Sequence, residues 1–361
     1  MNKQNITHEY YMQLALELAR QGLGTTSPNP MVGCVIVKNE KVIGQGFHVR
    51  SGEPHAEPNA INSCIEDVSG ADLYVTLEPC CHTNKKTPPC VNLIIEKKIK
   101  RVFVACLDPN PEVAGRGIEI LKKAGIETQV GILEQESNEL NEVFNKAITT
   151  NLPFVHLKLA QTLDGKMSTL SGDSKWITDE LARKEVHKLR LKYDAVMIGK
   201  NTLNNDNPSL DIRMGVNNKN KTPYRVILGN PDSFDMTSKI LSDDNPSKTI
   251  VLATSINKSE NRLNLEARGI KFIEHKSFNQ SLRDLKALGI QSILVEGGAR
   301  LAEEIIESEL YDRISIYVAP KVVGQGLSYF NKDNKFMADA INFEQSKVRV
   351  VGNQAVFEVR K

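Results

Sequence analysis

The amino-acid sequence predicts an α/β protein with two domains. A chain of 361 residues is long for a single hydrophobic core. Strand-like and helix-like patterns alternate along both halves, which is typical of layered α/β folds. The two series are separated at Asn151-Leu152-Pro153, where a proline follows an amphipathic stretch. We therefore expect one domain at residues 1–150 and a second at residues 151–361.

In the first domain, helices are assigned where apolar residues recur every three or four positions, and strands where β-branched residues cluster between turn signals. Gly22 and Gly24 end the first helix, and Pro88 and Pro89 precede a later one, since proline fits a helix start. The expected elements are a helix at 11–18, hairpin strands at 31–37 and 42–43, a helix at 55–66, a strand at 72–77, a helix at 90–98, a strand at 101–105, a helix at 117–124, a strand at 127–130 and a helix at 140–148.

The second domain repeats this alternation from Phe154 onward. Polar, weakly periodic stretches at 204–220 and 232–245 are expected to be loops. Strands are expected at 154–160, 194–198, 224–228, 249–253, 270–274, 292–296 and 312–319, and helices at 179–191, 260–267, 280–288 and 299–308.

Composition narrows the class of partner. Hydrophobic residues make up 40% of the chain and charged residues 25%, and the net charge is +2. These values give no reason to expect nucleic acid or a membrane surface as a partner. No apolar stretch is long enough to span a bilayer, and the first ten residues are polar. We expect a cytoplasmic protein that acts on a small molecule.

Four residues of the first domain predict a catalytic zinc site. His55 and Cys90 fall at expected helix starts, and Cys80 follows an expected strand, so all three reach one edge of the sheet. One nitrogen and two sulfur ligands leave a coordination position open for water, which marks a catalytic zinc. Glu57 would then shuttle protons. This H-x-E and P-C arrangement is that of zinc nucleobase deaminases.

The residues alone leave open a structural role for the metal, with two candidates for the fourth ligand. Cys81 or His82 could supply a fourth protein ligand, which would make the zinc structural and leave Glu57 without a role. The remaining cysteines, Cys34, Cys64 and Cys106, are expected to be small core residues.

The segments around these residues resemble the bifunctional deaminase/reductase family of riboflavin biosynthesis. The resemblance implies a cytidine-deaminase-like α/β/α fold that deaminates a diaminopyrimidinone carrying ribose 5-phosphate. It places Asn29, His82 and Lys86 against that substrate, although Asn29 could equally be a turn residue between prolines. The matching segments are 27–33, 52–57, 76–80, 86–90, 108–111 and 113–117.

The chain departs from the family at one point. Nine residues separate Cys80 from Cys90, where the family usually has eight. Cys81 would restore the usual spacing and is a competing ligand. We favour Cys80, because Glu78-Pro79-Cys80 directly follows the expected strand.

The second half resembles the reductase domain of the same family. No G-x-G-x-x-G fingerprint indicates a Rossmann domain; the resemblance instead implies a dihydrofolate-reductase-like α/β fold that uses NADPH. The matching segments are 158–165, 172–178, 201–206, 207–210 and 295–298. The resemblance places Ala160, Trp176, Thr202, Asp206 and Gly298 against NADPH, and Ser174, Arg190, Leu210, Arg213 and Glu296 against the substrate. It also favours a homo-oligomer, a dimer or tetramer.

Several of these residues have a simpler interpretation. Trp176, the only tryptophan, could be a core residue, and Arg190 could lie on a helix surface. Paired with Arg213, however, Arg190 would suit capture of a ribose phosphate. Lys158 and Asp164 are candidate proton donors for the reduction.

Two other functions share part of the pattern. RNA adenosine deaminases also carry H-x-E and P-C motifs, but they would leave some 210 residues without a role and favour a basic surface. A zinc-stabilised binding protein would not need Glu57. We therefore favour the bifunctional enzyme.

Overall fold

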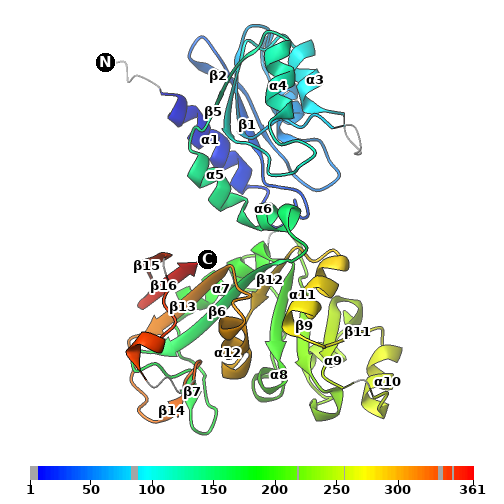
Figure 1. Cartoon of the computed structure of the whole chain (residues 1–361), viewed down its shortest axis with the longest axis vertical. Coiled ribbons are helices and arrows are strands. Elements are labelled where there is room, and N and C mark those ends of the chain that lie inside the picture. The colour runs from blue at the N-terminus through cyan, green and yellow to red at the C-terminus, as the bar shows by residue number, and fades with distance from the viewer. Residues whose placement is uncertain (1–6, 83–87, 218, 256, 332–335, 344) are drawn as a thin grey trace. The chain divides into compact units, whose positions relative to one another are not determined.

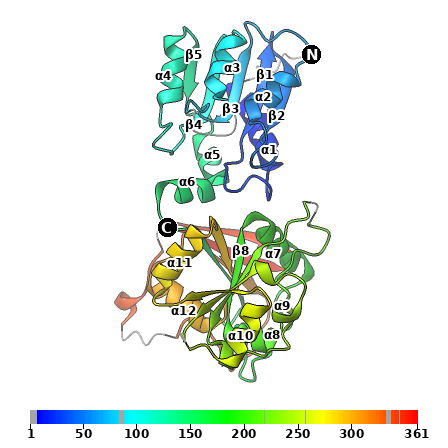
Figure 2. The ribbon, with the colours of Figure 1, turned by 90° about the vertical axis from the view of Figure 1, so that its right-hand side faces the viewer.

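The computed structural model describes residues 7–82, 88–217, 219–255, 257–331, 336–343 and 345–361. The chain forms two compact units, unit 1 at Met1–Asn151 and unit 2 at Leu152–Lys361. Each has its own sheet (Figures 1 and 2). Among the helices in these residues, none is both long and apolar enough to cross a membrane.

Unit 1 is built on a five-stranded mixed sheet with the order β2-β1-β3-β4-β5. The hairpin predicted near the amino terminus is present, and β1 pairs antiparallel with both β2 and β3, while β3, β4 and β5 are parallel. The carboxyl ends of β3 and β4 therefore meet at one sheet edge. The strands are β1 (Gly33–Lys38), β2 (Lys41–Phe47), β3 (Asp72–Leu77), β4 (Arg101–Cys106) and β5 (Glu127–Val130).

Helices cover both faces of this sheet, which confirms the predicted α/β/α arrangement. Ala60, Ile94 and Leu121, from α2 (Ala56–Asn62), α3 (Cys90–Glu96) and α4 (Arg116–Lys123), pack on one face. Met12, from α1 (His8–Arg20), packs on the other, beside α5 (Glu134–Leu140), and α6 (Glu142–Thr149) follows.

Two helix predictions in unit 1 were wrong in extent. The helix expected at 55–66 ends at Asn62, because the Ser63 hydroxyl bonds both the N–H and the C=O of Gln45 at 2.8 Å on β2. The helix expected at 140–148 is two helices that meet at Asn141. The Asn141 side chain bonds both backbone groups of Met31, at 2.8 and 2.9 Å, and this long-range contact fixes the break.

Unit 2 is built on a nine-stranded sheet with the order β11-β10-β9-β8-β12-β6-β13-β16-β15. The seven strands from β11 to β13 are parallel, and β16 and β15 add an antiparallel hairpin at one edge. The strands are β6 (Phe154–Thr162), β8 (Ala195–Gly199), β9 (Tyr224–Gly229), β10 (Thr249–Ala253), β11 (Lys271–Glu274), β12 (Ser292–Val295), β13 (Arg313–Ala319), β15 (Gln345–Val351) and β16 (Gln354–Arg360); β7 (Ser168–Thr169) and β14 (Gly326–Leu327) form a separate pair.

The helices of unit 2 also lie on both faces of its sheet. Leu282 of α11 (Phe278–Ala287) and Ile305 of α12 (Ala299–Glu307) pack on one face. Leu203, Ile240 and Leu265, from α8 (Lys200–Asp206), α9 (Lys239–Ser242) and α10 (Glu260–Ala267), pack on the other. A further helix, α7 (Glu180–Lys192), packs against β13 and β16 through Ala182. Parallel strands covered on both faces confirm the α/β class.

Candidate active sites

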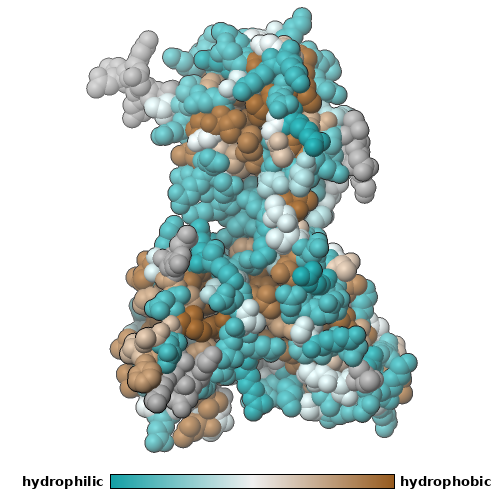
Figure 3. All heavy atoms as spheres, in the orientation of Figure 1, coloured by the Kyte–Doolittle hydropathy of each residue, from teal (hydrophilic) through white to brown (hydrophobic). Residues whose placement is uncertain are grey.

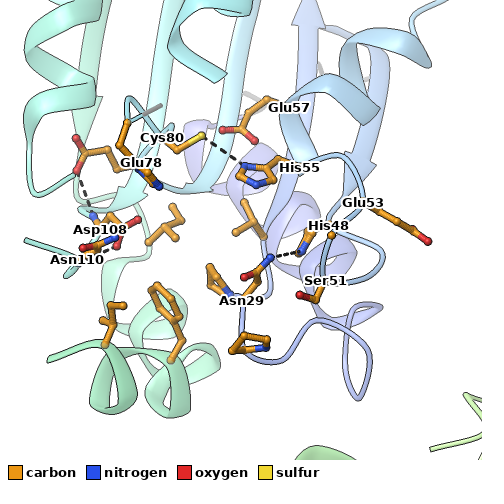
Figure 4. Close-up of a pocket in the computed structure, with 18 residues that line it drawn as sticks. Asn29, His48, Ser51, Glu53, His55, Glu57, Glu78, Cys80, Asp108 and Asn110 are labelled. Carbon is orange, nitrogen blue, oxygen red and sulfur yellow. Dashed lines mark hydrogen bonds between the residues drawn. The ribbon is translucent and has the colours of Figure 1, made fainter. Parts of the chain in front are cut away.

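His55, Cys80 and Cys90 form one cluster in unit 1 (Figure 4). Their ligand atoms lie within 4.8 Å of one another, and each Sγ is 3.5 Å from His55 Nδ1. His55 is the N-cap of α2 and Cys90 is the first residue of α3, so the two helix starts hold these side chains at the edge reached by Cys80 after β3. Imidazole nitrogen and cysteine sulfur are the donors that zinc prefers.

Cys81 lies apart from this cluster. Among the described residues, the group that could hold a metal contains Cys80 and not Cys81, whose side chain packs against the core under α2 and α3. The geometry therefore favours Cys80. Lys86 lies outside the described residues. His82 lines the same pocket, and its buried Nδ1 has no hydrogen-bond partner within the described chain.

Glu57 sits beside the cluster, in the first turn of α2, and is 3% exposed. Burial, together with the nearby Cys80, raises the pKa of the Glu57 carboxyl to about 7, against opposing effects of His55 and Cys90. A divalent cation at the neighbouring ligand atoms would lower this pKa. A carboxyl whose pKa lies near neutral can both take and return a proton.

A pocket of about 470 Å³ opens in front of Glu57 and His55. This volume suits a ligand of nucleotide size. Phe144 contributes an apolar wall, and Asn29, Asp108 and Asn110 contribute polar groups. Asn29, a predicted substrate residue, therefore lies in the same pocket as the cluster. His48 also lines the pocket and was not predicted, since an isolated histidine carries no motif.

Glu78 anchors the loop that forms one wall of this pocket. Its carboxylate, 3% exposed, accepts hydrogen bonds from four backbone N–H groups. Oε1 accepts from Gly117 at 2.8 Å and Ile118 at 3.3 Å, and Oε2 accepts from Gly115 at 2.8 Å and Asp108 at 3.2 Å. One side chain thus fixes the wall at Asp108 and the start of α4. Its position directly before Pro79-Cys80 places Glu78 near the metal cluster but gives no sign of these distant bonds.

We expect Glu78→Ala to destabilise unit 1 by about 1–3 kcal/mol, because it leaves buried N–H groups unpaired. Chemical denaturation of the full chain measures this change. Glu112→Ala is the matched control, since Glu112 lies on the same loop with an exposed side chain and should change stability by less than about 0.5 kcal/mol. Equal stability of the two variants would contradict the anchoring role.

In unit 2, the residues that the resemblance assigned to the cofactor gather at the carboxyl ends of the strands. Thr202 and Asp206 lie on α8, and Gly298 is the N-cap of α12. A Cβ on Gly298 would lie 3.6 Å from Thr202 Oγ1, so these two elements adjoin. Lys175 Nζ donates to the Asp206 carbonyl at 3.3 Å and ties the Trp176 segment, which includes Ser174, to α8. Ala160 lies on β6.

Trp176 is not a core residue. Its side chain is 62% exposed, so the core-packing alternative was wrong. The Arg183 guanidinium lies 4.7 Å from the centre of the indole ring, and Lys321 Nζ donates to the Trp176 carbonyl at 2.6 Å. Arg183 thus contacts the exposed ring, and Lys321 holds the backbone that carries it.

Arg190 is buried, and the surface alternative for it was also wrong. It is 9% exposed and pairs bidentately with Glu296, at 2.6 and 2.9 Å, while Nη1 donates to the Asp211 carbonyl at 2.8 Å. The guanidinium edge expected to hold a phosphate therefore faces a carboxylate. Arg213 remains exposed beside Asp211, at 3.0 Å. Leu210 is 2% exposed, so a substrate would meet its backbone.

The pKa of each candidate proton donor departs from its ordinary value. The Asp164 carboxylate accepts hydrogen bonds from Thr162 Oγ1, Val323 N and Gly324 N, and these bonds lower the pKa of Asp164 to about 2. These bonds favour the ionised carboxylate, which holds no proton to give, and this argues against Asp164 as the donor. Burial lowers the pKa of Lys158, which neighbours Glu296.

Comparisons with known proteins cover the same two units. Residues 5–106 match the family model of the cytidine and deoxycytidylate deaminase zinc-binding region, and residues 153–357 match that of the RibD C-terminal domain. The riboflavin biosynthesis protein RibD of Aquifex aeolicus is 42% identical over 348 residues, which are 96% of each chain. The chain belongs to the RibD family. It is a bifunctional deaminase and reductase of riboflavin biosynthesis, and the RNA-deaminase and binding-protein hypotheses are set aside.

Solved structures of family members agree with this fold. The chain matches RibD of Acinetobacter baumannii with a TM-score of 0.89 and 40% identity, over 98% of each chain. It matches the diaminohydroxyphosphoribosylaminopyrimidine deaminase/5-amino-6-(5-phosphoribosylamino)uracil reductase of Thermotoga maritima with a TM-score of 0.88 and 38% identity, again over 98% of each. The predicted fold class is confirmed, and the zinc-binding deaminase family and the reductase family are both present in one chain.

Proposed function

We propose that unit 1 converts 2,5-diamino-6-(5-phosphoribosylamino)pyrimidin-4-one into 5-amino-6-(5-phosphoribosylamino)uracil, and that unit 2 reduces the ribosyl group of this product to ribityl with NADPH. The observation that carries the proposal is the buried Glu57 beside the His55, Cys80 and Cys90 cluster, on a pocket of nucleotide size. The name of the Thermotoga maritima relative supplies the substrates.

In the deaminase, His55, Cys80 and Cys90 would hold zinc. Bound zinc supplies the Lewis acidity that makes water a nucleophile near neutral pH. Glu57 takes the proton from the attacking water and returns it to the leaving amine, so that ammonia departs. Asn29, His82 and Lys86 would orient the pyrimidine and its phosphate.

In the reductase, Ala160, Trp176, Thr202, Asp206 and Gly298 would hold NADPH, which supplies the hydride for C1′ of the open-chain imine. Gly298 supports this role, since it leads the α12 amino terminus, where backbone N–H groups favour phosphate. Lys158 is the proposed source of the proton that the imine nitrogen gains as the C=N bond becomes a single bond. Its lowered pKa suits release of a proton.

On the substrate side of the reductase, Arg213 is the proposed phosphate ligand, with Ser174, the Leu210 backbone and the Arg190–Glu296 pair around the ribose. Arg213 suits this role because its guanidinium is exposed beside Asp211 and is held there by a single carboxylate contact at 3.0 Å. The buried Arg190–Glu296 pair would present the remaining acceptor capacity of its carboxylate to ribose hydroxyls.

Nucleotide preference tests the reductase half. Supplied with 5-amino-6-(5-phosphoribosylamino)uracil, the enzyme should oxidise NADPH faster than NADH, measured by the loss of nicotinamide absorbance. Faster oxidation of NADH, or no oxidation of either, would contradict the proposal. We also propose a cytoplasmic, reducing location, because none of the six cysteines, all of which lie within the described residues, is joined in a disulfide.

We also propose that the enzyme is a homo-oligomer joined through β15 and β16. Val348 and Val350 on the edge strand are 60% and 75% exposed, and Phe357, which pairs with Val348, is 43% exposed. Figure 3 shows hydrophobic residues gathered on this side of unit 2. A second copy of the chain can cover such a face by a two-fold, self-complementary contact that also pairs the edge strand.

Sedimentation tests this interface. The parent chain should sediment as an oligomer, and Val350→Lys should sediment as a monomer, because a charge cannot be buried there without a partner. Val42→Lys, on the edge strand β2 of unit 1, is the control and should leave the assembly unchanged. A monomeric parent chain would contradict the proposal.

A further inference from the structure

A chain of three groups determines which way the Asn29 amide faces in the deaminase pocket. The Pro54 carbonyl oxygen lies 3.1 Å from His48 Nδ1, and His48 Nε2 lies 3.1 Å from Asn29 Nδ2. The His48 ring is 2% exposed, so water does not compete for these bonds. Figure 4 shows the Asn29 nitrogen directed at His48 and its amide oxygen directed away from it.

The chemistry of the carbonyl decides the direction of every bond in this chain. A carbonyl oxygen can only accept, so we assign the proton of the neutral imidazole to Nδ1. Nε2 is then an acceptor, and it must receive a proton from Asn29. Only the amide nitrogen of Asn29 can donate one. The Asn29 amide is therefore held in a single orientation.

This orientation leaves Asn29 Oδ1 to face a ligand. No described residue forms a hydrogen bond to this oxygen, and Asn29 lines the pocket together with Glu57 and His55. An amide that could rotate would present either an acceptor or a donor to a ligand. An amide held by His48 presents only an acceptor.

We propose that His48 is a positioning residue for the deaminase, and that it fixes Asn29 as an acceptor for an N–H group of the pyrimidine. The inference rests on the proposed function of unit 1 and adds a rule of selectivity to it. Pyrimidines with an N–H at the position facing Asn29 bind productively, and analogues with a carbonyl or a C–H there are rejected, because they would cover Oδ1 and leave it unpaired.

Two substitutions of His48 separate this role from simple packing. His48→Gln keeps the polarity of the chain, since the glutamine nitrogen can donate to Pro54 and its oxygen can accept from Asn29. His48→Phe keeps the size and shape of an aromatic ring but provides no hydrogen bond. We expect deaminase kcat/KM to fall about tenfold in His48→Phe and to recover most of that loss in His48→Gln. A packing role predicts the opposite order.

A double-mutant cycle tests whether His48 acts through Asn29. In the Asn29→Ala background, His48→Phe should cause no further loss of deaminase kcat/KM, because the group that His48 orients is already absent. Zinc content and the NADPH-dependent reductase rate of each full-length variant should equal those of the parent enzyme.

Three results with His48→Phe would overturn the inference. His48→Phe could have the same deaminase kcat/KM as the parent. It could also lower kcat/KM by the same factor whether or not Asn29 is present, which would mean that His48 acts independently of Asn29. It could also lose zinc, which would mean that His48 acts through His55, whose ring lies 5.5 Å away. A parent enzyme that reduces but does not deaminate would overturn the proposed function of unit 1 itself, and the inference with it.

Discussion

Glu57→Gln is expected to lower deaminase kcat by about 10²–10⁴-fold, while the enzyme keeps its zinc. Glutamine has nearly the same shape as glutamate, so the 3% exposed position should accommodate it without loss of the neighbouring cluster. It can neither take a proton from water nor return one to the leaving amine. Ammonia release measures the activity, and metal analysis of the same sample measures the zinc.

Two controls make this result specific to Glu57. Glu66→Gln, at an exposed position, should deaminate like the parent enzyme. The reductase rate of Glu57→Gln on pre-deaminated substrate should also be normal, because unit 2 has its own core. A Glu57→Gln enzyme that retained full deaminase activity would remove Glu57 from the mechanism.

Glu296→Ala is expected to destabilise unit 2 by about 3–5 kcal/mol. The substitution leaves the buried Arg190 guanidinium without its bidentate carboxylate, and a buried unpaired charge is costly. Burial alone would raise the pKa of Glu296, but Arg190, together with Lys158 and His187, lowers it, so the carboxyl is ionised at neutral pH. Unfolding is measured by denaturant titration of the full chain with the fluorescence of Trp176 as the signal. Because Trp176 is the only tryptophan, this signal reports on unit 2 alone.

An exposed ion pair in the same unit is the matched control. Lys361 and Glu309 lie 3.2 Å apart with side chains 50% and 72% exposed, and Glu309→Gln should cost less than about 1 kcal/mol. If Glu296→Ala lost as little stability as Glu309→Gln, the buried pair would not be important for the stability of unit 2.

The sequence predicted the metal cluster because its signals are local. His55, Cys80 and Cys90 each follow directly from a strand end or a helix start, and parallel strand ends share one sheet edge. The choice of Cys80 over Cys81 could be argued in the same way, since the strand before Glu78 ends where predicted.

Residues whose role depends on distant backbone were not predictable. Glu78 bonds N–H groups 30 to 40 positions away, and Asn141 breaks a helix by bonding Met31 at a separation of 110 positions. His48 acts on Asn29 across 19 positions, with no motif to mark it. Such contacts exist only once the sheet has formed.

Unit 2 shows the same limit. The polar stretches expected to be loops contain part of α8 and all of α9, whose few apolar residues, Leu203 and Ile240, pack on the sheet. No strand was predicted after residue 319, yet β15 and β16 extend the sheet there. The sequence of β15 does alternate, as Lys347-Val348-Arg349-Val350, but its valines are exposed, whereas such a pattern predicts that the apolar residues are buried.

One chain carries both enzymes, and we propose that the deaminase depends on zinc and the reductase does not. The most direct test is to follow both reactions before and after removal of zinc by a chelator. We expect the chelated enzyme to release no ammonia from the diaminopyrimidine, to oxidise NADPH still with the pre-deaminated uracil, and to regain deamination when zinc is restored. Deamination that survives complete loss of zinc, or NADPH oxidation that is lost with it, would contradict this division of metal dependence between the two units.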